Sequence, residues 1–116
     1  MSDDFEIAVD TSQPRAIVVR VRGRVDGRTA SRLLERALDA RVPGRAIVLN
    51  LGEVTFLSSA GVGMIMVLSE TLGRDSAALR LAPVSSAVSS VLGLLNLDQF
   101  LSIHESEADA LDKLAS

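Results

Sequence analysis

The pattern of apolar and polar positions predicts strands and helices that alternate along the chain. Short runs rich in apolar and β-branched residues predict strands at 5–9, 16–22, 45–51, 78–82 and 100–103. Apolar residues three and four positions apart predict helices at 29–42, 61–72, 84–95 and 106–114. The order β-β-α-β-α-β-α-β-α predicts one α/β domain over residues 1–116, with helices covering a mixed sheet of four to five strands and Ser106 as N-cap of the closing helix.

The segment VTFLSSAGVGMIMVLSE, residues 54–70, departs from a simple strand-to-helix junction. Ser58 and Ser59 stand where the strand ends, and a serine before a helix is an ordinary N-cap. Gly61 and Gly63 follow, although each glycine costs a helix about 1 kcal/mol relative to alanine. Small residues here would leave a low surface suited to close approach by another protein. Local capping and partner binding are both open interpretations of this segment.

The helix after the serines, VGMIMVL, is apolar on almost every side. One side can cover the sheet, and the other then leaves apolar surface near the serines. The sequence leaves open whether such surface forms a homodimer.

Charge is distributed unevenly, although the net charge is only −3. Residues 1–45 hold nine arginines and seven acidic residues, whereas residues 46–116 hold three basic and eight acidic residues. Arginines recur at regular spacing on a predicted strand and on the helix after it: Arg20, Arg22 and Arg24, then Arg28, Arg32 and Arg36. The simpler interpretation is two solvated faces, and the alternative is a docking surface for an acidic partner.

The sequence lacks the residues that several classes of function require. The chain has no cysteine and one histidine, His104. Neither a metal site nor a catalytic base for a Ser59 nucleophile is therefore indicated. We expect that the protein is not an enzyme and binds no cofactor. Net negative charge and the scarcity of aromatic residues argue against nucleic acid. The longest run of apolar residues and glycine, 60–68, is under half of the roughly 20 residues of a membrane span. The acidic N-terminus lacks the features of a signal peptide, so we expect a cytoplasmic protein without membrane contact.

The stretch VLNLGEVTFLSSAGVGMIM resembles the signature segment of STAS domains, in particular the stand-alone bacterial anti-sigma factor antagonists. In that family an apolar strand and a short link precede Phe/Tyr-apolar-Asp-Ser-Ser/Thr-Gly-Leu-Gly at the start of a helix. GRVDGRTA, residues 23–30, is similar to the family's Gly-Glu-Leu-Asp turn, and the ending FLSIHESEADAL also resembles the family. The likeness covers the whole chain in order, and it implies the STAS fold.

The resemblance assigns the family's phosphorylated serine to Ser59, with Ser58 as the second choice. Ser58 stands where the family has aspartate, and Ala60 where it has serine or threonine. Asp26 matches the acid of the early turn, whereas Arg24 replaces a glutamate. Asp26 has an alternative role as a turn-forming or capping residue before Thr29. The partner surface implied is Arg24, Asp26, Ser58, Ala60, Gly61, Val62, Gly63 and Met64.

By resemblance, the unphosphorylated protein binds an anti-sigma factor that is also a serine/threonine kinase, and so frees a sigma factor. The kinase would use ATP and Mg²⁺ to phosphorylate Ser59 and break the complex, and a protein phosphatase would reverse the change. The alternative is a STAS scaffold that is never phosphorylated and binds a protein or small ligand constitutively. A small α/β hydrolase using Ser59 and a domain appended to an anion transporter are less favoured.

Overall fold

The computed structural model describes residues 5–115, and the acidic start of the chain lies outside them. Five strands and four α-helices alternate in the predicted order, which confirms the α/β class. The strands are β1 (Glu6–Asp10), β2 (Ala16–Val25), β3 (Ala46–Leu57), β4 (Leu79–Val84) and β5 (Ser102–Ile103). The helices are α1 (Gly27–Ala40), α2 (Ser59–Arg74), α3 (Ser86–Leu94) and α4 (Glu107–Ala115), with a 3₁₀ turn, η1 (Leu97–Gln99), before β5.

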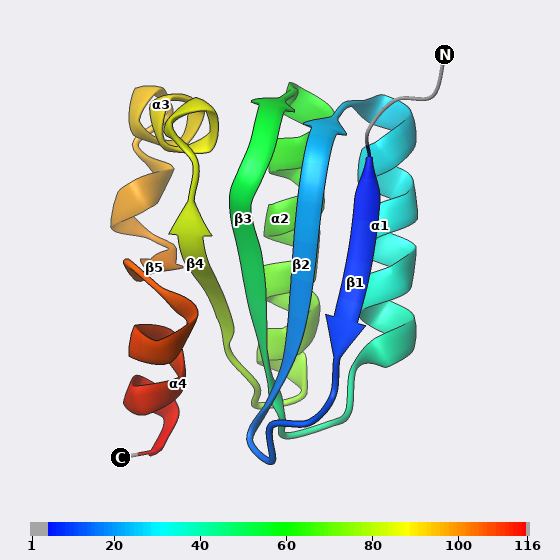
Figure 1. Ribbon diagram of the computed structural model, residues 1–116, viewed down its shortest axis with the longest axis vertical. Coiled ribbons are helices and arrows are strands. Elements are labelled where there is room, and N and C mark those ends of the chain that lie inside the picture. Colours follow the sequence, from blue (N-terminus) through cyan, green and yellow to red (C-terminus); the bar gives the residue numbers. More distant parts are fainter. Residues whose placement is uncertain (1–4, 116) are drawn as a thin grey trace.

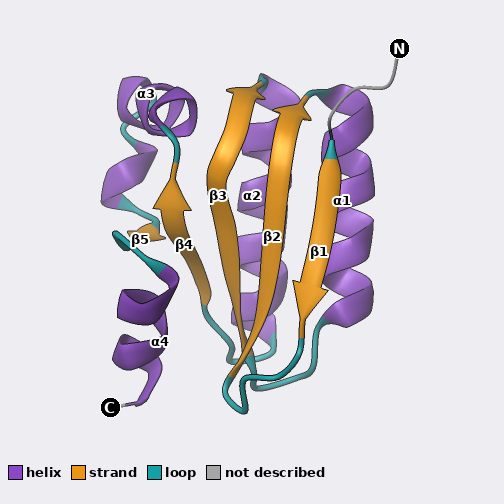
Figure 2. Cartoon of the chain, viewed as in Figure 1, coloured by secondary structure: helices purple, strands orange, loops and turns teal. Residues whose placement is uncertain are grey.

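The strands form one sheet in the order β1-β2-β3-β4-β5. β1 pairs antiparallel with β2, and all later pairs are parallel, so the sheet is mixed as expected. Helices α1 and α2 lie behind the sheet, whereas α4 lies beside β4 at the other end of the strand order from β1 (Figures 1 and 2). This arrangement places β1 and α1 at one flank of the molecule and α3, η1 and β5 at the other.

Alternation along β2 explains how the two faces of the sheet differ. Ile17, Val19 and Val21 are buried in the larger core cluster, which also holds the apolar stripes of α1 and α2. Ala16 and Val18 point to the other face and pack in a second, smaller cluster that includes Ala110 of α4. Further along the same face, β2 carries exposed arginines at alternate positions, of which Arg20 contacts α4.

A polar cluster anchors α4 to the sheet. Arg20 of β2 donates to both carboxylate oxygens of Glu107, at 2.8 and 2.9 Å, and its third contact is with Asp10 of β1. Asn50 of β3 donates to the same Glu107 carboxylate at 2.6 Å. Glu107 is the first residue of α4, where a negative charge also interacts favourably with the helix dipole. Arg20 is therefore a structural ion-pair partner rather than only a solvated side chain.

The observed boundaries differ from the predicted ones mainly at the ends of β2 and β3, and of the predicted strand 100–103 only Ser102–Ile103 pair with β4, because Phe100 ends the 3₁₀ turn. β3 continues past Leu51 to Leu57, because its backbone keeps pairing with β2 through polar positions that the apolar pattern does not mark. α2 begins at Ser59 rather than at Gly61 and runs one residue past Gly73. Ser106 accepts the N–H of Asp109 at 3.1 Å, which confirms the predicted cap of α4. Within residues 5–115, no helix has the length and apolar character needed to cross a membrane.

Replacing Glu107 should detach α4 from the sheet in part. We expect Glu107→Gln to lower the free energy of unfolding by about 1–3 kcal/mol, because Arg20 and Asn50 lose a charged hydrogen-bond acceptor. Chemical denaturation at neutral pH measures the change. Glu105→Gln is the control, since Glu105 is exposed and has no such contact; equal losses in both variants would contradict the anchoring role.

The same carboxylate makes stability depend on pH. The Arg20 guanidinium lowers the pKa of Glu107 below its usual 4.5, and Asn50 lowers it further, although burial opposes both. A lowered folded-state pKa means that the stabilisation is complete above the unfolded-state pKa and is lost as pH falls through the folded value. The difference in unfolding free energy between wild type and Glu107→Gln should therefore shrink as pH drops below 4.5. A difference that stays constant into acid would contradict this assignment.

Candidate functional site

The candidate site lies at the edge of the sheet where β2 and β3 end. These strands pair in parallel as far as Val25 and Leu57, and the N–H of Ser58 then donates to the carbonyl of Val25 at 2.9 Å. Helices α1 and α2, which follow the two strands, pack against each other and begin at this edge (Figure 1). Two helix N-termini therefore share one edge, where free N–H groups and helix dipoles favour negative charge.

The two adjacent serines have different environments. Ser58 is half-buried and is the N-cap of α2, with its Oγ accepting the backbone N–H of Gly61 at 3.2 Å. Ser59 is the first residue of the helix and is exposed, and no hydrogen bond engages its hydroxyl within the described residues. The capping interpretation therefore applies to Ser58, and the hydroxyl at this junction that remains accessible is that of Ser59.

Asp26 caps α1 in the same way that Ser58 caps α2. Its carboxylate accepts the N–H groups of Arg28 and Thr29, and its own N–H donates to the Thr29 hydroxyl oxygen at 2.8 Å. That hydroxyl donates in turn to the carbonyl of Arg24 at 2.7 Å. The hydrogen bonds from Thr29 lower the pKa of Asp26. The capping alternative for Asp26 is therefore confirmed.

The two glycines of α2 serve different purposes. A Cβ at Gly61 would lie 2.5 Å from Leu57 Cδ1 and 3.0 Å from Val25 Cγ1, so glycine is required for the helix to approach the ends of both strands. A Cβ at Gly63 would meet nothing within 4 Å. Gly61 is thus explained by packing, whereas Gly63 only keeps the exposed surface of the helix low.

Helix α2 divides into a buried side and an exposed apolar side, as its sequence predicted. Ile65, Leu68 and Leu72 pack in the core, whereas Met66 and Val67 are 38% and 46% exposed. A groove of about 150 Å³ between α1 and α2 lies next to the serines; its lining residues are Gly27, Ala30, Ser31, Leu34, Ala60, Met64 and Val67. We call this the α1–α2 groove.

The structure corrects two members of the expected partner surface. Gly61 and Met64 are buried, because Gly61 packs on Leu57 and Met64 turns into the core, so Met64 contributes only to the base of the α1–α2 groove. Val62 is half-buried against the same core. Ala60 and Gly63 are exposed beside Ser59, so they remain available at the surface.

Arg24 and Phe56 form an exposed pair that extends this surface across the ends of β2 and β3. The two residues are register partners, and the Arg24 guanidinium lies 4.2 Å from the centre of the Phe56 ring. The sequence had identified Arg24 as a surface candidate but not Phe56, nor Leu34 and Val67 of the groove. Leu34 is one of the apolar residues at helical spacing in the predicted helix 29–42, and only the packing of α1 against α2 leaves it at the groove.

The lone histidine takes no part in this site. His104 follows β5, where its ring contacts Arg80 at 3.0 Å and Asp109 at 3.3 Å. Among residues 5–115, no cluster of three or more His, Cys, Asp or Glu side chains is placed to hold a metal ion.

Comparison with known proteins matches the model of the STAS domain family to residues 8–110. The anti-sigma F factor antagonist of Paenibacillus polymyxa is 26% identical over 101 residues, which cover 84% of this chain and 86% of that protein. Among solved structures, an anti-sigma factor antagonist from Mycobacterium paratuberculosis superposes with a TM-score of 0.83 at 24% identity, covering 100% of this chain and 98% of the other.

The antagonist SpoIIAA is similar in fold in two states. Its unphosphorylated form has a TM-score of 0.77 at 18% identity and covers 95% of this chain and 96% of its own. Its phosphorylated form, described as a Bacillus cell fate determinant, has a TM-score of 0.70 at 18% identity and covers 94% of this chain and 99% of its own. At this level of identity the superpositions show a shared fold.

Alanine substitution at the two glycines should act in opposite directions. Gly63→Ala should raise the free energy of unfolding by up to about 1 kcal/mol, because the added Cβ meets open space and alanine favours helix. Gly61→Ala should lower it by about 1–3 kcal/mol, because Leu57 and Val25 must move. Denaturant titration measures the free energy of unfolding of both variants. A stabilising effect of Gly61→Ala would refute the close-packing explanation.

Proposed function

Because the chain belongs to the STAS domain family, we propose that it is an anti-sigma factor antagonist that works by partner switching in the cytoplasm. In its unphosphorylated form it binds an anti-sigma factor with serine kinase activity and so frees a sigma factor. The kinase phosphorylates Ser59 with its own ATP and Mg²⁺, which breaks the complex, and a protein phosphatase restores binding. The observation that carries the proposal is the exposed Ser59 hydroxyl beside the α1–α2 groove.

Ser59 is the better acceptor of the two serines for a geometric reason. A kinase must reach the hydroxyl, and Ser59 is exposed, whereas the Ser58 hydroxyl is half-buried and holds the N–H of Gly61. A phosphate on Ser58 would displace the cap of α2. A phosphate on Ser59 would leave that cap in place and would stand at a helix N-terminus, where negative charge is tolerated.

The binding surface combines apolar and polar parts around this hydroxyl. The α1–α2 groove and the exposed Val67 offer apolar area to a partner. Arg24, stacked on Phe56, and Asp26 supply charge at the same edge. A surface of this kind, an apolar centre with charged residues around it, is typical of specific protein interfaces.

Phosphorylation would act on the interface and not on the fold. It adds about −1.5 to −2 charge at neutral pH. Bulk, desolvation and repulsion from acidic side chains of the partner would then oppose binding, and like-charge contacts can cost several kcal/mol, where about 1.4 kcal/mol is a tenfold change in affinity. The SpoIIAA structures in two phosphorylation states are consistent with a STAS fold that accommodates this modification.

Substitutions at the serines test the switch. We expect Ser59→Ala to bind a kinase-type anti-sigma factor from the same genome like the wild type and to resist phosphorylation by it. Ser59→Asp should bind at least about tenfold more weakly, because it places negative charge in the interface. Calorimetric titration with the purified anti-sigma factor measures both affinities.

The control variant is Ser58→Ala, which should lose about 1 kcal/mol of stability through the cap and yet still be phosphorylated. Fragmentation mass spectrometry that separates Ser58 from Ser59, on protein from its own cells, locates the phosphate. Equal affinities of Ser59→Ala and Ser59→Asp for the anti-sigma factor, or phosphate on neither serine in any growth state, would contradict the switch and indicate a scaffold that binds its partner constitutively.

A charged residue in the α1–α2 groove should also weaken partner binding. Val67→Asp is expected to weaken binding at least about tenfold, because an ion would have to be desolvated in an apolar contact. Val42→Asp is a matched control, since Val42 is 41% exposed after the C-terminal end of α1, away from the groove. Equal affinity of the two variants would remove the groove from the interface.

A further inference from the structure

A second apolar surface lies outside the candidate site, at the end of α3 and around η1. Leu94, Leu95 and Phe100 are 85%, 53% and 77% exposed, and all three occur within seven residues of the chain. Large apolar side chains scattered singly on a surface are ordinary, but a group of this exposure indicates an interaction surface. None of the three lines the α1–α2 groove. We call them the α3–η1 patch.

The chain around this patch is acidic. Residues 84–106, from the end of β4 to the cap of α4, contain two acidic residues, Asp98 and Glu105, and no lysine or arginine. Asp98 lies within η1 between the patch residues, and Glu105 follows β5. Neither carboxylate forms an ion pair with another described residue. The α3–η1 patch is therefore complementary to a partner surface that has apolar and basic groups.

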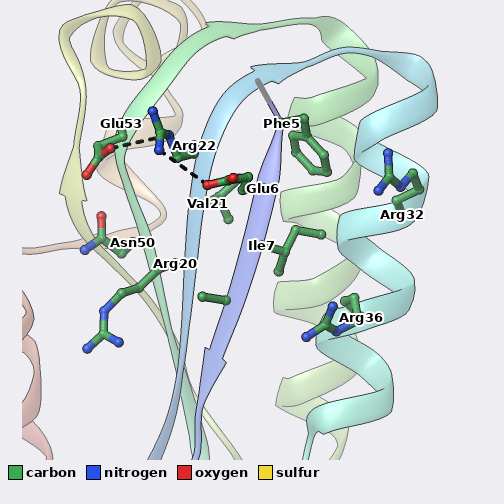
Figure 3. A pocket seen from close by; sticks show the side chains of 11 residues that line it. Phe5, Glu6, Ile7, Arg20, Val21, Arg22, Arg32, Arg36, Asn50 and Glu53 are labelled. Carbon is green, nitrogen blue, oxygen red and sulfur yellow. Dashed lines mark hydrogen bonds and ion pairs between the residues drawn. The ribbon is translucent and has the colours of Figure 1, made fainter. Parts of the chain in front are cut away.

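The opposite flank of the same molecule has those groups. A hollow of about 470 Å³ adjoins β1, and its α1 side is lined by the buried Phe5, the half-buried Ile7, and the exposed Arg32 and Arg36 (Figure 3). On its other side Arg22 forms ion pairs with Glu6 and Glu53. Arg32 lies 5.3 Å from the centre of the Phe5 ring, so apolar and cationic groups are adjacent. Within residues 5–115, no carboxylate pairs with Arg32 or Arg36. We call these four residues the β1–α1 groove.

We propose that the chain associates head to tail, with the α3–η1 patch of one copy docked in the β1–α1 groove of the next. The two surfaces complement each other in charge, since Asp98 and Glu105 would face Arg32 and Arg36. They lie on opposite flanks of the sheet (Figure 1), so one copy cannot satisfy both within itself. Contact between unlike surfaces repeats from copy to copy and produces short chains or rings.

Other occupants fit the patch less well. Two patches meeting each other would bring Asp98 and Glu105 against the same acids of the partner copy. An anionic lipid surface would meet the same repulsion. Three exposed side chains supply only part of the roughly 800 Å² per partner of a stable interface, so the self-association is weak and depends on concentration.

The test uses two variants that each disable one surface. Leu94→Gln/Phe100→Gln removes the apolar patch, and Arg32→Glu/Arg36→Glu reverses the charge of the groove. Sedimentation velocity from low to high micromolar protein should show the wild type growing in mass with concentration, less so at high salt. Each variant alone should stay monomeric. A mixture of the two should form a one-to-one dimer and nothing larger, because only one intact patch and one intact groove can meet.

Each other outcome overturns the proposal. A wild type that stays monomeric at every concentration excludes self-association, and a groove variant that still associates by itself indicates patch-to-patch contact instead. A mixture that remains monomeric excludes the pairing of these two surfaces. Arg74→Glu, an exposed charge reversal on α2, is the control and should associate like the wild type. If circular dichroism shows that a double variant is unfolded, the single variants Phe100→Ala and Arg36→Glu replace the two double variants in the same experiment.

Discussion

The parallel pairing of β2 and β3 up to Val25 and Leu57 places the two helix starts of the candidate site at one edge. The hydrogen bond from the Ser58 N–H to the Val25 carbonyl continues this pairing into the first residue beyond the strand. Because Val25 and Leu57 are register partners, the residues that follow them, Asp26 and Ser58, cap neighbouring helices at the same edge of the sheet. A shift of β3 by one residue would turn Leu57 away from the core and separate the caps.

Close packing at this edge determines which serine is accessible. Glycine at position 61 lets α2 approach Val25 and Leu57, and the Ser58 hydroxyl is then used to hold the N–H of Gly61. Ser59 is left at the surface as the first residue of α2, at the positive end of that helix dipole. The cap of α2 and the accessible hydroxyl therefore come from adjacent residues with separate roles, so a change at Ser59 need not disturb the fold.

Charged side chains lie on both flanks of the sheet. The flank of β1 and α1 carries Arg32 and Arg36 together with Glu6, Glu35 and Asp39, and the flank of α3, η1 and β5 carries Asp98 and Glu105. Between them, Arg20 is neutralised by Asp10 and Glu107, which join the first strands to the last helix. The arginine-rich stretch of the sequence thus separates into a structural part in the sheet and an exposed part on α1.

The sequence by itself determined the order of the elements, the mixed sheet and the position of the serine junction, because periodicity, caps and turn residues are local signals. Tertiary structure decided the rest. It assigned the cap to Ser58, turned Met64 inward, and brought Leu34 beside Val67. It also joined Arg20 to Glu107, 87 residues along the chain. These outcomes depend on which surfaces of separate elements meet, and no pattern within one element encodes that contact.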